Sequence, residues 1–272
     1  MREARSRLAV LGDPLTFTRS PELHRAGLEA LGLPGSSIAL CTSPEELPGR
    51  MRSLDQQGFR GVNLTHPLKE CVLPLLARVS PAARTARSVN TVGFEPDGWW
   101  GDTTDGPGLI DWLGSLGRPP ERETAVLLGA GGAARSLALA LASAGARGLA
   151  ASARDPSGAA ARWSDLPMAE IVPWRSRTER SWLARASLVI HATPRPAAEV
   201  APPLSSIPRS ALLLDLSYAE APTPWVLAAR AEGREAYDGL GLLVFQARRS
   251  LALWYAGPVP LDPLARAVGW PR

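Results

Sequence analysis

The sequence predicts an α/β protein of two domains, the second of which contains a doubly wound parallel sheet. Three observations favour this fold. A chain of 272 residues suits two ordinary domains, short apolar runs alternate with helical stretches, and a glycine-rich turn follows one apolar run near the middle of the chain. The hydrophobic and charged fractions, 45% and 21%, are those of a globular protein.

Strand and helix patterns alternate through the first hundred residues. Arg7–Gly12 (RLAVLG) predicts a buried strand, and Ser20-Pro21 supplies a cap and a first-turn proline for a helix to about Leu31. Asp97-Gly98 predicts a hairpin turn. Further strands are expected at Ser37–Cys41, Gly61–Leu64 and Val89–Phe94, and further helices at Pro44–Gln57 and Pro67–Ala77.

A second unit is expected to begin near Gly106. Thr124–Leu128 predicts a strand and Ala133–Ala144 a tightly packed helix, with a run of glycine and alanine between them. Later strands are expected at Gly148–Ser152, Leu188–His191 and Leu212–Leu214, and a long final helix at Leu240–Tyr255. Strands that alternate with helices in this way are typical of a doubly wound parallel sheet.

Several functional classes are disfavoured by composition. No apolar run reaches the roughly 18–20 residues of a membrane span, and the first residues lack a signal-peptide pattern, so we expect a cytoplasmic protein without a membrane partner. The net charge of +4 comes from scattered arginines, which disfavours nucleic-acid binding. Cys41 and Cys71 have no metal-ligand spacing, so we expect buried free thiols and no metal site.

The glycine-rich turn predicts a dinucleotide site. Gly129-x-Gly131-x-x-Ala134 follows an expected strand and opens an expected helix. The first glycine permits the tight turn, the second lets the backbone approach a pyrophosphate, and the small third residue lets the helix pack on the strand. The amino terminus of that helix favours the negative charge of the phosphates.

The residues after the next strand bear on the choice between NADP and NAD. Arg154 could hold a 2′-phosphate, whereas Asp155 could hold the free 2′-hydroxyl of NAD. Asp155 also precedes Pro156, and this order is typical of a helix cap followed by a first-turn proline. We therefore expect NADP, with NAD as the alternative.

Lys69 is the only lysine among 30 lysine and arginine residues. A salt bridge or a phosphate contact would tolerate arginine, but arginine does not lose its proton in proteins. A lysine can serve as an acid or a base, so its retention at position 69 predicts a role in proton transfer. Asp105, in a glycine-flanked acidic turn, is the expected carboxylate partner.

Seven ordered motifs extend across nearly the whole chain. They are TRSPELH at Thr18–His24, GVNLTHPLK at Gly61–Lys69, SVNTV at Ser88–Val92, GDTTDG at Gly101–Gly106, GAGGAAR at Gly129–Arg135, DLSY at Asp215–Tyr218 and DGLGLLVFQ at Asp238–Gln246. Together and in this order, they resemble the motifs of the shikimate dehydrogenase family.

The resemblance implies an enzyme that reversibly reduces 3-dehydroshikimate to shikimate with NADPH in aromatic amino-acid biosynthesis. It implies an N-terminal α/β substrate domain of residues 1–105, completed by C-terminal helices in residues 239–272. A Rossmann-type dinucleotide-binding domain of residues 106–238 would be inserted between these two parts. The partner would be a small-molecule substrate, and the protein would be a monomer or a homodimer.

The resemblance also implies roles for individual residues. Lys69 and Asp105 would form the catalytic pair. The residues implied to bind substrate are Thr18, Ser20, Thr65, Asn90, Asp105, Tyr218 and Gln246. The residues implied to bind the cofactor are Gly129, Ala130, Gly131, Gly132, Ala133, Arg154, Leu216 and Gly239.

Departures from the family pattern leave alternatives open. The family's N-R-T-x-x-R stretch, which meets the 2′-phosphate, is Ala153–Gly158 here and has one arginine instead of two. An NAD-using or dual-cofactor quinate/shikimate dehydrogenase is therefore the alternative enzyme. A non-catalytic relative that binds a shikimate-like ligand is a third possibility, although it would be expected to lose Lys69 or Asp105. His191 stands where the family usually has asparagine, and we expect it to be structural.

Overall fold

The computed structural model describes residues 6–166 and 168–271. The chain divides into two compact units. The first extends to Gly108 and resumes at Leu243–Pro271, and the second is Leu109–Leu242. Helices α5 (Asp105–Ser115) and α11 (Leu240–Tyr255) each contain a boundary between the units. No helix within the described residues is long and apolar enough to cross a membrane.

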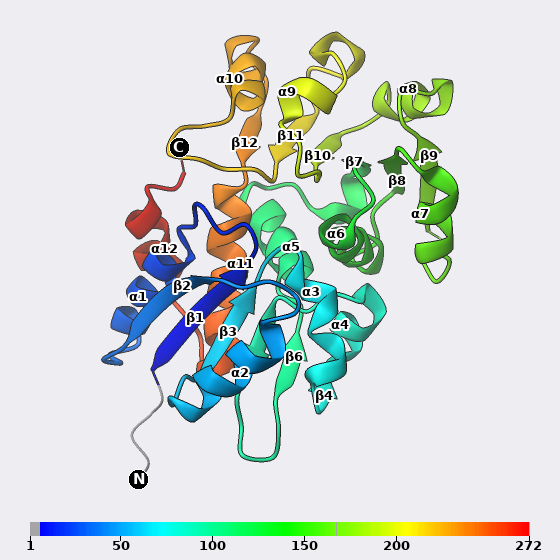
Figure 1. The fold of residues 1–272 in the computed structure, drawn as a ribbon. Helices are drawn as coiled ribbons and strands as arrows, with labels where there is room; N and C mark the ends of the chain where they lie inside the picture. The colour runs from blue at the N-terminus through cyan, green and yellow to red at the C-terminus, as the bar shows by residue number, and fades with distance from the viewer. Residues whose placement is uncertain (1–5, 167, 272) are drawn as a thin grey trace. The chain divides into compact units, whose positions relative to one another are not determined.

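The first unit is built on a mixed six-stranded sheet with the order β2-β1-β3-β5-β6-β4 (Figure 1). Strands β1, β2 and β3 are parallel, and β5 runs antiparallel to β3 and β6. The predicted turn at Asp97-Gly98 lies between β5 and β6. The strands are β1 (Arg7–Gly12), β2 (Ser36–Cys41), β3 (Gly61–Leu64), β4 (Arg78–Val79), β5 (Thr91–Gly93) and β6 (Trp100–Asp102).

Helices cover this sheet and complete its core. Leu47, Met51 and Leu54 of α2 are buried against Ala9, Leu11 and other apolar side chains of the sheet. Helix α12 packs beside α1, as Figure 1 shows. The helices of this unit are α1 (Ser20–Ala30), α2 (Leu47–Gln56), α3 (Leu68–Cys71), α4 (Pro81–Ala86) and α12 (Leu261–Val268), with a 3₁₀ turn at Leu73–Leu75.

The second unit confirms the predicted doubly wound sheet. Its six strands have the order β9-β8-β7-β10-β11-β12, and every adjacent pair is parallel (Figure 1). Numbered within the unit, this is the 3-2-1-4-5-6 order of the Rossmann fold. The strands are β7 (Thr124–Leu128), β8 (Gly148–Ala153), β9 (Ala169–Pro173), β10 (Leu188–His191), β11 (Leu212–Asp215) and β12 (Ala236–Asp238).

The core of the second unit lies between the sheet and the helices that connect its strands. On one face, Val126 and Val189 of the sheet pack with Trp182 of α8 and Trp225 of α10. The helices are α6 (Gly132–Ser143), α7 (Pro156–Arg162), α8 (Arg177–Leu183), α9 (Ala197–Val200) and α10 (Pro224–Ala231), with 3₁₀ turns at Pro120–Arg122 and Leu204–Ser206.

Two sequence expectations are corrected by the structure. The helix expected at Pro67–Ala77 is only the four residues of α3 followed by a 3₁₀ turn, because Pro74 has no N–H with which to continue an α-helix. Cys41 and Cys71 are free thiols, but both are exposed where buried thiols were expected. Strands β4, β9 and β12 and helices α4 and α12 were not predicted.

Candidate functional site

Backbone hydrogen bonds and a buried side chain fix the segment that carries Lys69. After β3 ends, the N–H of Thr65 donates to the carbonyl of Leu11, and the N–H of Leu68 donates to the carbonyl of Thr65. The side chain of Leu68 is fully buried, which anchors α3 to the core. Gly12 leaves room for Thr65, since a Cβ at Gly12 would lie 2.3 Å from Cγ2 of Thr65.

The structure brings Lys69 and Asp105 into direct contact. The Nζ atom of Lys69 donates to Oδ2 of Asp105 at 2.6 Å. The two side chains are 19% and 10% exposed. Partial burial reduces solvent screening of such a pair, while the remaining exposure leaves the amine accessible to a small molecule. Asp105 is the first residue of α5, so its backbone position is set by that helix.

The carboxylate of Asp105 is oriented by Asn90. The Nδ2 atom of Asn90 donates to Oδ1 of Asp105 at 2.9 Å and to Oγ1 of Thr104 at 2.9 Å, with Oε1 of Gln246 at 3.3 Å. Its Oδ1 accepts from the N–H of Thr104 at 2.7 Å. Lys69, Asn90, Asp105 and Gln246, which the sequence places far apart, therefore form one polar cluster within the first unit.

Three residues with no predicted role, Asn63, Thr91 and Ser250, extend this cluster into the core. Oγ of Ser250 lies 2.8 Å from Oγ1 of Thr91 and 3.1 Å from Oγ1 of Thr104, and it accepts from Nδ2 of Asn63 at 3.1 Å. Ser250 follows Gln246 by four residues on α11 and so shares its helix face. A pair of uncharged polar residues at that spacing, among apolar residues of the same helix, was the available signal.

His24 is connected to the polar cluster through Asn63. Its Nε2 lies 2.8 Å from Oδ1 of Asn63, and its Nδ1 lies 2.8 Å from Oγ of Ser37. Because Nδ2 of Asn63 donates elsewhere, its Oδ1 is the acceptor, and a neutral imidazole that is protonated on Nε2 satisfies both contacts. Burial lowers the pKa of His24 to about 4, although the hydrogen bond to Asn63 acts in the opposite direction.

This buried imidazole predicts an acid-sensitive stability. An unfolded chain would protonate His24 near pH 6.5 and the folded chain only near pH 4, so the unfolded state binds more protons between these values. The free energy of unfolding is therefore expected to fall as the pH falls through this window, by about 3 kcal/mol in total. Denaturant unfolding at several pH values should show a shallower slope for His24→Gln than for the wild type. Equal slopes for the wild type and His24→Gln would contradict this prediction.

The other residues assigned to substrate lie in three places. Oγ1 of Thr18 lies 3.3 Å from Oγ of Ser20 and accepts from the N–H of Ser20 at 3.2 Å, so these hydroxyls form a pair at the start of α1. Thr65 precedes α3 and is partly exposed. Tyr218 belongs to the second unit, after β11, so its assignment to substrate remains a prediction.

The glycine-rich turn joins β7 to α6 in the second unit. Gly129 has φ of +122°, and a Cβ there would lie 2.8 Å from the carbonyl oxygen of Ala192, so both conformation and space require glycine. Gly131, the N-cap of α6, has an ordinary φ of −84°, and nothing lies within 4 Å of a Cβ built on it. The protein itself thus has room for a Cβ at position 131, and the predicted contact of this glycine with a pyrophosphate remains a prediction.

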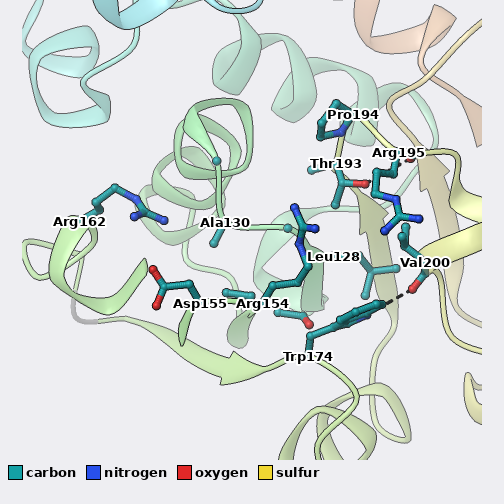
Figure 2. A pocket seen from close by; sticks show the side chains of 15 residues that line it. Leu128, Ala130, Arg154, Asp155, Arg162, Trp174, Thr193, Pro194, Arg195 and Val200 are labelled. Atoms are coloured by element: carbon teal, nitrogen blue, oxygen red, sulfur yellow. Dashed lines mark hydrogen bonds between the residues drawn. The ribbon is translucent and has the colours of Figure 1, made fainter. Parts of the chain in front are cut away.

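A cavity of about 310 Å³ opens over this turn. Gly129, Ala130 and Gly131 form part of its lining, whereas Gly132 and Ala133 are in the first turn of α6 and do not line it. Figure 2 shows Arg154 at the centre of the lining, with Arg162 and Arg195 to either side.

The side chain of Asp155 caps the amino terminus of α7. Its Oδ1 accepts from the N–H of Gly158 at 3.0 Å at the start of α7, as the order of aspartate and proline suggested. The carboxylate is therefore directed at the helix terminus, and a cap of this kind typically stabilises a helix by about 1 kcal/mol.

Leu216 and Gly239 meet at the end of β11 and β12. A Cβ on Gly239 would lie 2.0 Å from the carbonyl oxygen of Leu216, so the fold itself requires glycine there. Neither residue lines the cavity above the glycine turn, so their assignment to the cofactor remains a prediction.

His191 is enclosed by the end of the sheet. Its Nδ1 lies 2.8 Å from Oδ1 of Asp215, and its Nε2 lies 2.8 Å from Oγ1 of Thr193. Burial by itself would raise the pKa of Asp215, but hydrogen bonds with His191 and Thr223 outweigh it and lower the pKa below its usual value. A fully buried ring with both nitrogens engaged favours the structural role expected for His191.

Comparisons with known proteins agree with the motifs. Residues 10–92 match the shikimate dehydrogenase substrate binding domain. The NADP(+) shikimate dehydrogenase of Acidiphilium cryptum is 38% identical over 268 residues, which are 97% of this chain and 96% of that protein. The corresponding protein of Dinoroseobacter shibae is 36% identical over 267 residues, 95% of each chain.

Solved structures of shikimate dehydrogenases also resemble this chain in fold and sequence. The shikimate 5-dehydrogenase of Thermus thermophilus, solved with NADP(H) and shikimate, superimposes with a TM-score of 0.86 at 34% identity and covers 97% of this chain and 98% of its own. The shikimate dehydrogenase of Mycobacterium tuberculosis gives a TM-score of 0.85 at 29% identity, with coverage of 97% and 98%. On motifs, fold and sequence identity together, the chain belongs to the shikimate dehydrogenase family.

Proposed function

We propose that this protein is an NADP-dependent shikimate dehydrogenase, which reversibly reduces 3-dehydroshikimate to shikimate in the chorismate route to aromatic amino acids. The observation that carries the proposal is the contact between Nζ of Lys69 and Oδ2 of Asp105 at 2.6 Å, supported by Asn90. A relative that only bound ligand would have no need to keep both members of this pair. The enzyme is proposed to act in the cytoplasm, as a monomer or a homodimer.

The first unit would bind the substrate and handle its proton. Lys69 donates a proton to the oxygen that becomes the hydroxyl of shikimate, or stabilises its negative charge as the charge develops. Asp105 holds the amine in place and offers an acceptor to a substrate hydroxyl. The carboxylate and hydroxyls of the substrate are proposed to be held by Thr18, Ser20, Thr65, Asn90, Tyr218 and Gln246.

The second unit would hold the cofactor, and its residues fit a dinucleotide. The open space above Gly131 allows a pyrophosphate to approach the backbone at the start of α6. Arg154 lines the cavity after β8, where the fold is expected to hold a ribose 2′-phosphate. Leu216 and Gly239 are proposed to lie beside the nicotinamide. When bound, NADPH supplies the hydride, and the protein contributes binding and orientation.

One assay separates the proposed function from its alternatives. The purified protein is expected to reduce NADP⁺ when shikimate is added, with kcat/KM higher for NADP⁺ than for NAD⁺ and higher for shikimate than for quinate. A preference for NAD⁺ or for quinate would favour a quinate/shikimate dehydrogenase. Absence of nicotinamide reduction in all four combinations would overturn the catalytic proposal and favour a ligand-binding relative.

Gly131→Val tests the nucleotide site. A Cβ fits at position 131, but valine is a poorer N-cap than glycine for α6, so the thermal unfolding midpoint of the free protein should fall only slightly. The branched side chain would keep a pyrophosphate from the backbone, and the lost hydrogen bonds should weaken NADP⁺ binding by about tenfold or more. Calorimetric titration measures this change. Wild-type affinity in the Gly131→Val variant would place the nucleotide elsewhere.

A further inference from the structure

The carboxylate that caps α7 lies close to position 158. Asp155 accepts from the N–H of Gly158, and a Cβ on Gly158 would lie 2.0 Å from Oδ2 of Asp155 and 2.9 Å from its Cγ. A side chain at position 158 would therefore require the carboxylate of Asp155 to shift.

Arg162 lies one turn further along α7, and its guanidinium comes close to position 158. Its Nη1 lies 3.3 Å from the Cβ position of Gly158, although the two residues are four apart in sequence. Residues at this spacing share a helix face, and Figure 2 shows the side chain of Arg162 directed towards the cavity that it helps to line. The guanidinium of Arg162 thus lies beside position 158.

The partners of the nearby arginines show which of them are available to a ligand. Arg135 is buried and donates to both carboxylate oxygens of Asp165, at 2.6 and 2.8 Å. Arg195 donates to Glu199 at 2.7 Å. Within residues 6–166 and 168–271, by contrast, the guanidinium groups of Arg154 and Arg162 have no hydrogen-bond or ion-pair partner.

The charge of the cavity favours an anion. Three guanidinium groups line it against a single carboxylate, and that carboxylate, on Asp155, is directed at the N–H of Gly158. Guanidinium groups bind phosphate through paired, charge-assisted hydrogen bonds. We propose that Arg162 and Arg154 together bind the 2′-phosphate of NADP, with Arg162 acting in place of the side chain that Gly158 lacks. This inference rests on the proposed dinucleotide site.

Binding of nucleotide fragments tests the proposal without relying on turnover. Calorimetric titration of the full chain would compare 2′,5′-ADP with 5′-AMP, which lacks the 2′-phosphate. Arg162→Gln is expected to weaken 2′,5′-ADP by about tenfold or more and to change 5′-AMP by less than about twofold. Arg209→Gln is the matched control, since it removes one exposed positive charge from the same unit outside the cavity and should change neither affinity.

Each outcome decides the proposal. Unchanged binding of 2′,5′-ADP by Arg162→Gln, or equal weakening of both nucleotides, would overturn the role of Arg162 while leaving the dinucleotide site intact. Failure of the wild-type protein to bind 2′,5′-ADP, 5′-AMP and NADP⁺ would overturn the proposed function as well. Arg162 is exposed, and the carbonyl that it offers to Arg135 belongs to its backbone, so Arg162→Gln is expected to fold normally.

Discussion

Lys69→Met is expected to lower kcat for shikimate oxidation by about 10²–10⁴-fold, the usual contribution of a general acid or base. Methionine preserves much of the length and apolar stem of lysine but has no transferable proton. Steady-state rates with saturating NADP⁺ give the measurement, and the KM for shikimate should change much less than kcat. Unfolding by denaturant should show that the variant is folded.

Two further variants show why position 69 requires lysine. Lys69→Arg keeps the positive charge but not an amine that releases its proton, so it should remain at least about tenfold below the wild type in kcat. Glu70→Gln, on the next and exposed residue of α3, should retain wild-type kcat. If Lys69→Met or Lys69→Arg turned over within about twofold of the wild type, proton transfer by Lys69 would be excluded.

Asp105→Asn should lower kcat by about 10²-fold or more while keeping the shape of the side chain. The substitution removes the charge that faces Nζ of Lys69 at 2.6 Å and introduces an amide hydrogen-bond donor where two donors already converge, from Lys69 and Asn90. Steady-state kinetics with shikimate measure the loss. Asp97→Asn, in the exposed turn between β5 and β6, is the control and should have little effect.

A double variant tests whether the pair acts as a unit. If Asp105 acts by positioning Lys69, the variant that combines Lys69→Met with Asp105→Asn should be little slower than Lys69→Met alone. Losses that multiply across the two positions would show independent roles and would contradict the pairing proposed for catalysis.

Features that depend on local chemistry could be predicted from the sequence. The apolar run of β7 and the glycines after it fix a strand, a tight turn and a helix start within a dozen residues, and the structure has all three at the expected place. The cap at Asp155 was predictable for the same reason, since aspartate, proline and the first turn of α7 are adjacent. The single lysine predicted a role in proton transfer at position 69, and the resemblance to the family added the substrate on which Lys69 would act.

Features that depend on distant partners could not be predicted in this way. Strand β12 is only three residues long and is defined by pairing with β11, which no local pattern encodes. The polar cluster behind Asp105 joins Asn63, Thr91 and Ser250 from separate elements. Arg162 was missed because its relation to Gly158 follows from the direction of its side chain along α7.

Because the chain has a single lysine, position 69 can be labelled selectively. Amine-selective acylating or aldehyde reagents can modify one side chain, Lys69, in addition to the terminal amine. Partial exposure of that side chain makes the reaction feasible in the folded protein, and bound ligand would shield it. Mass spectrometry of the labelled protein would thus report occupancy of the site directly, with no engineered tag.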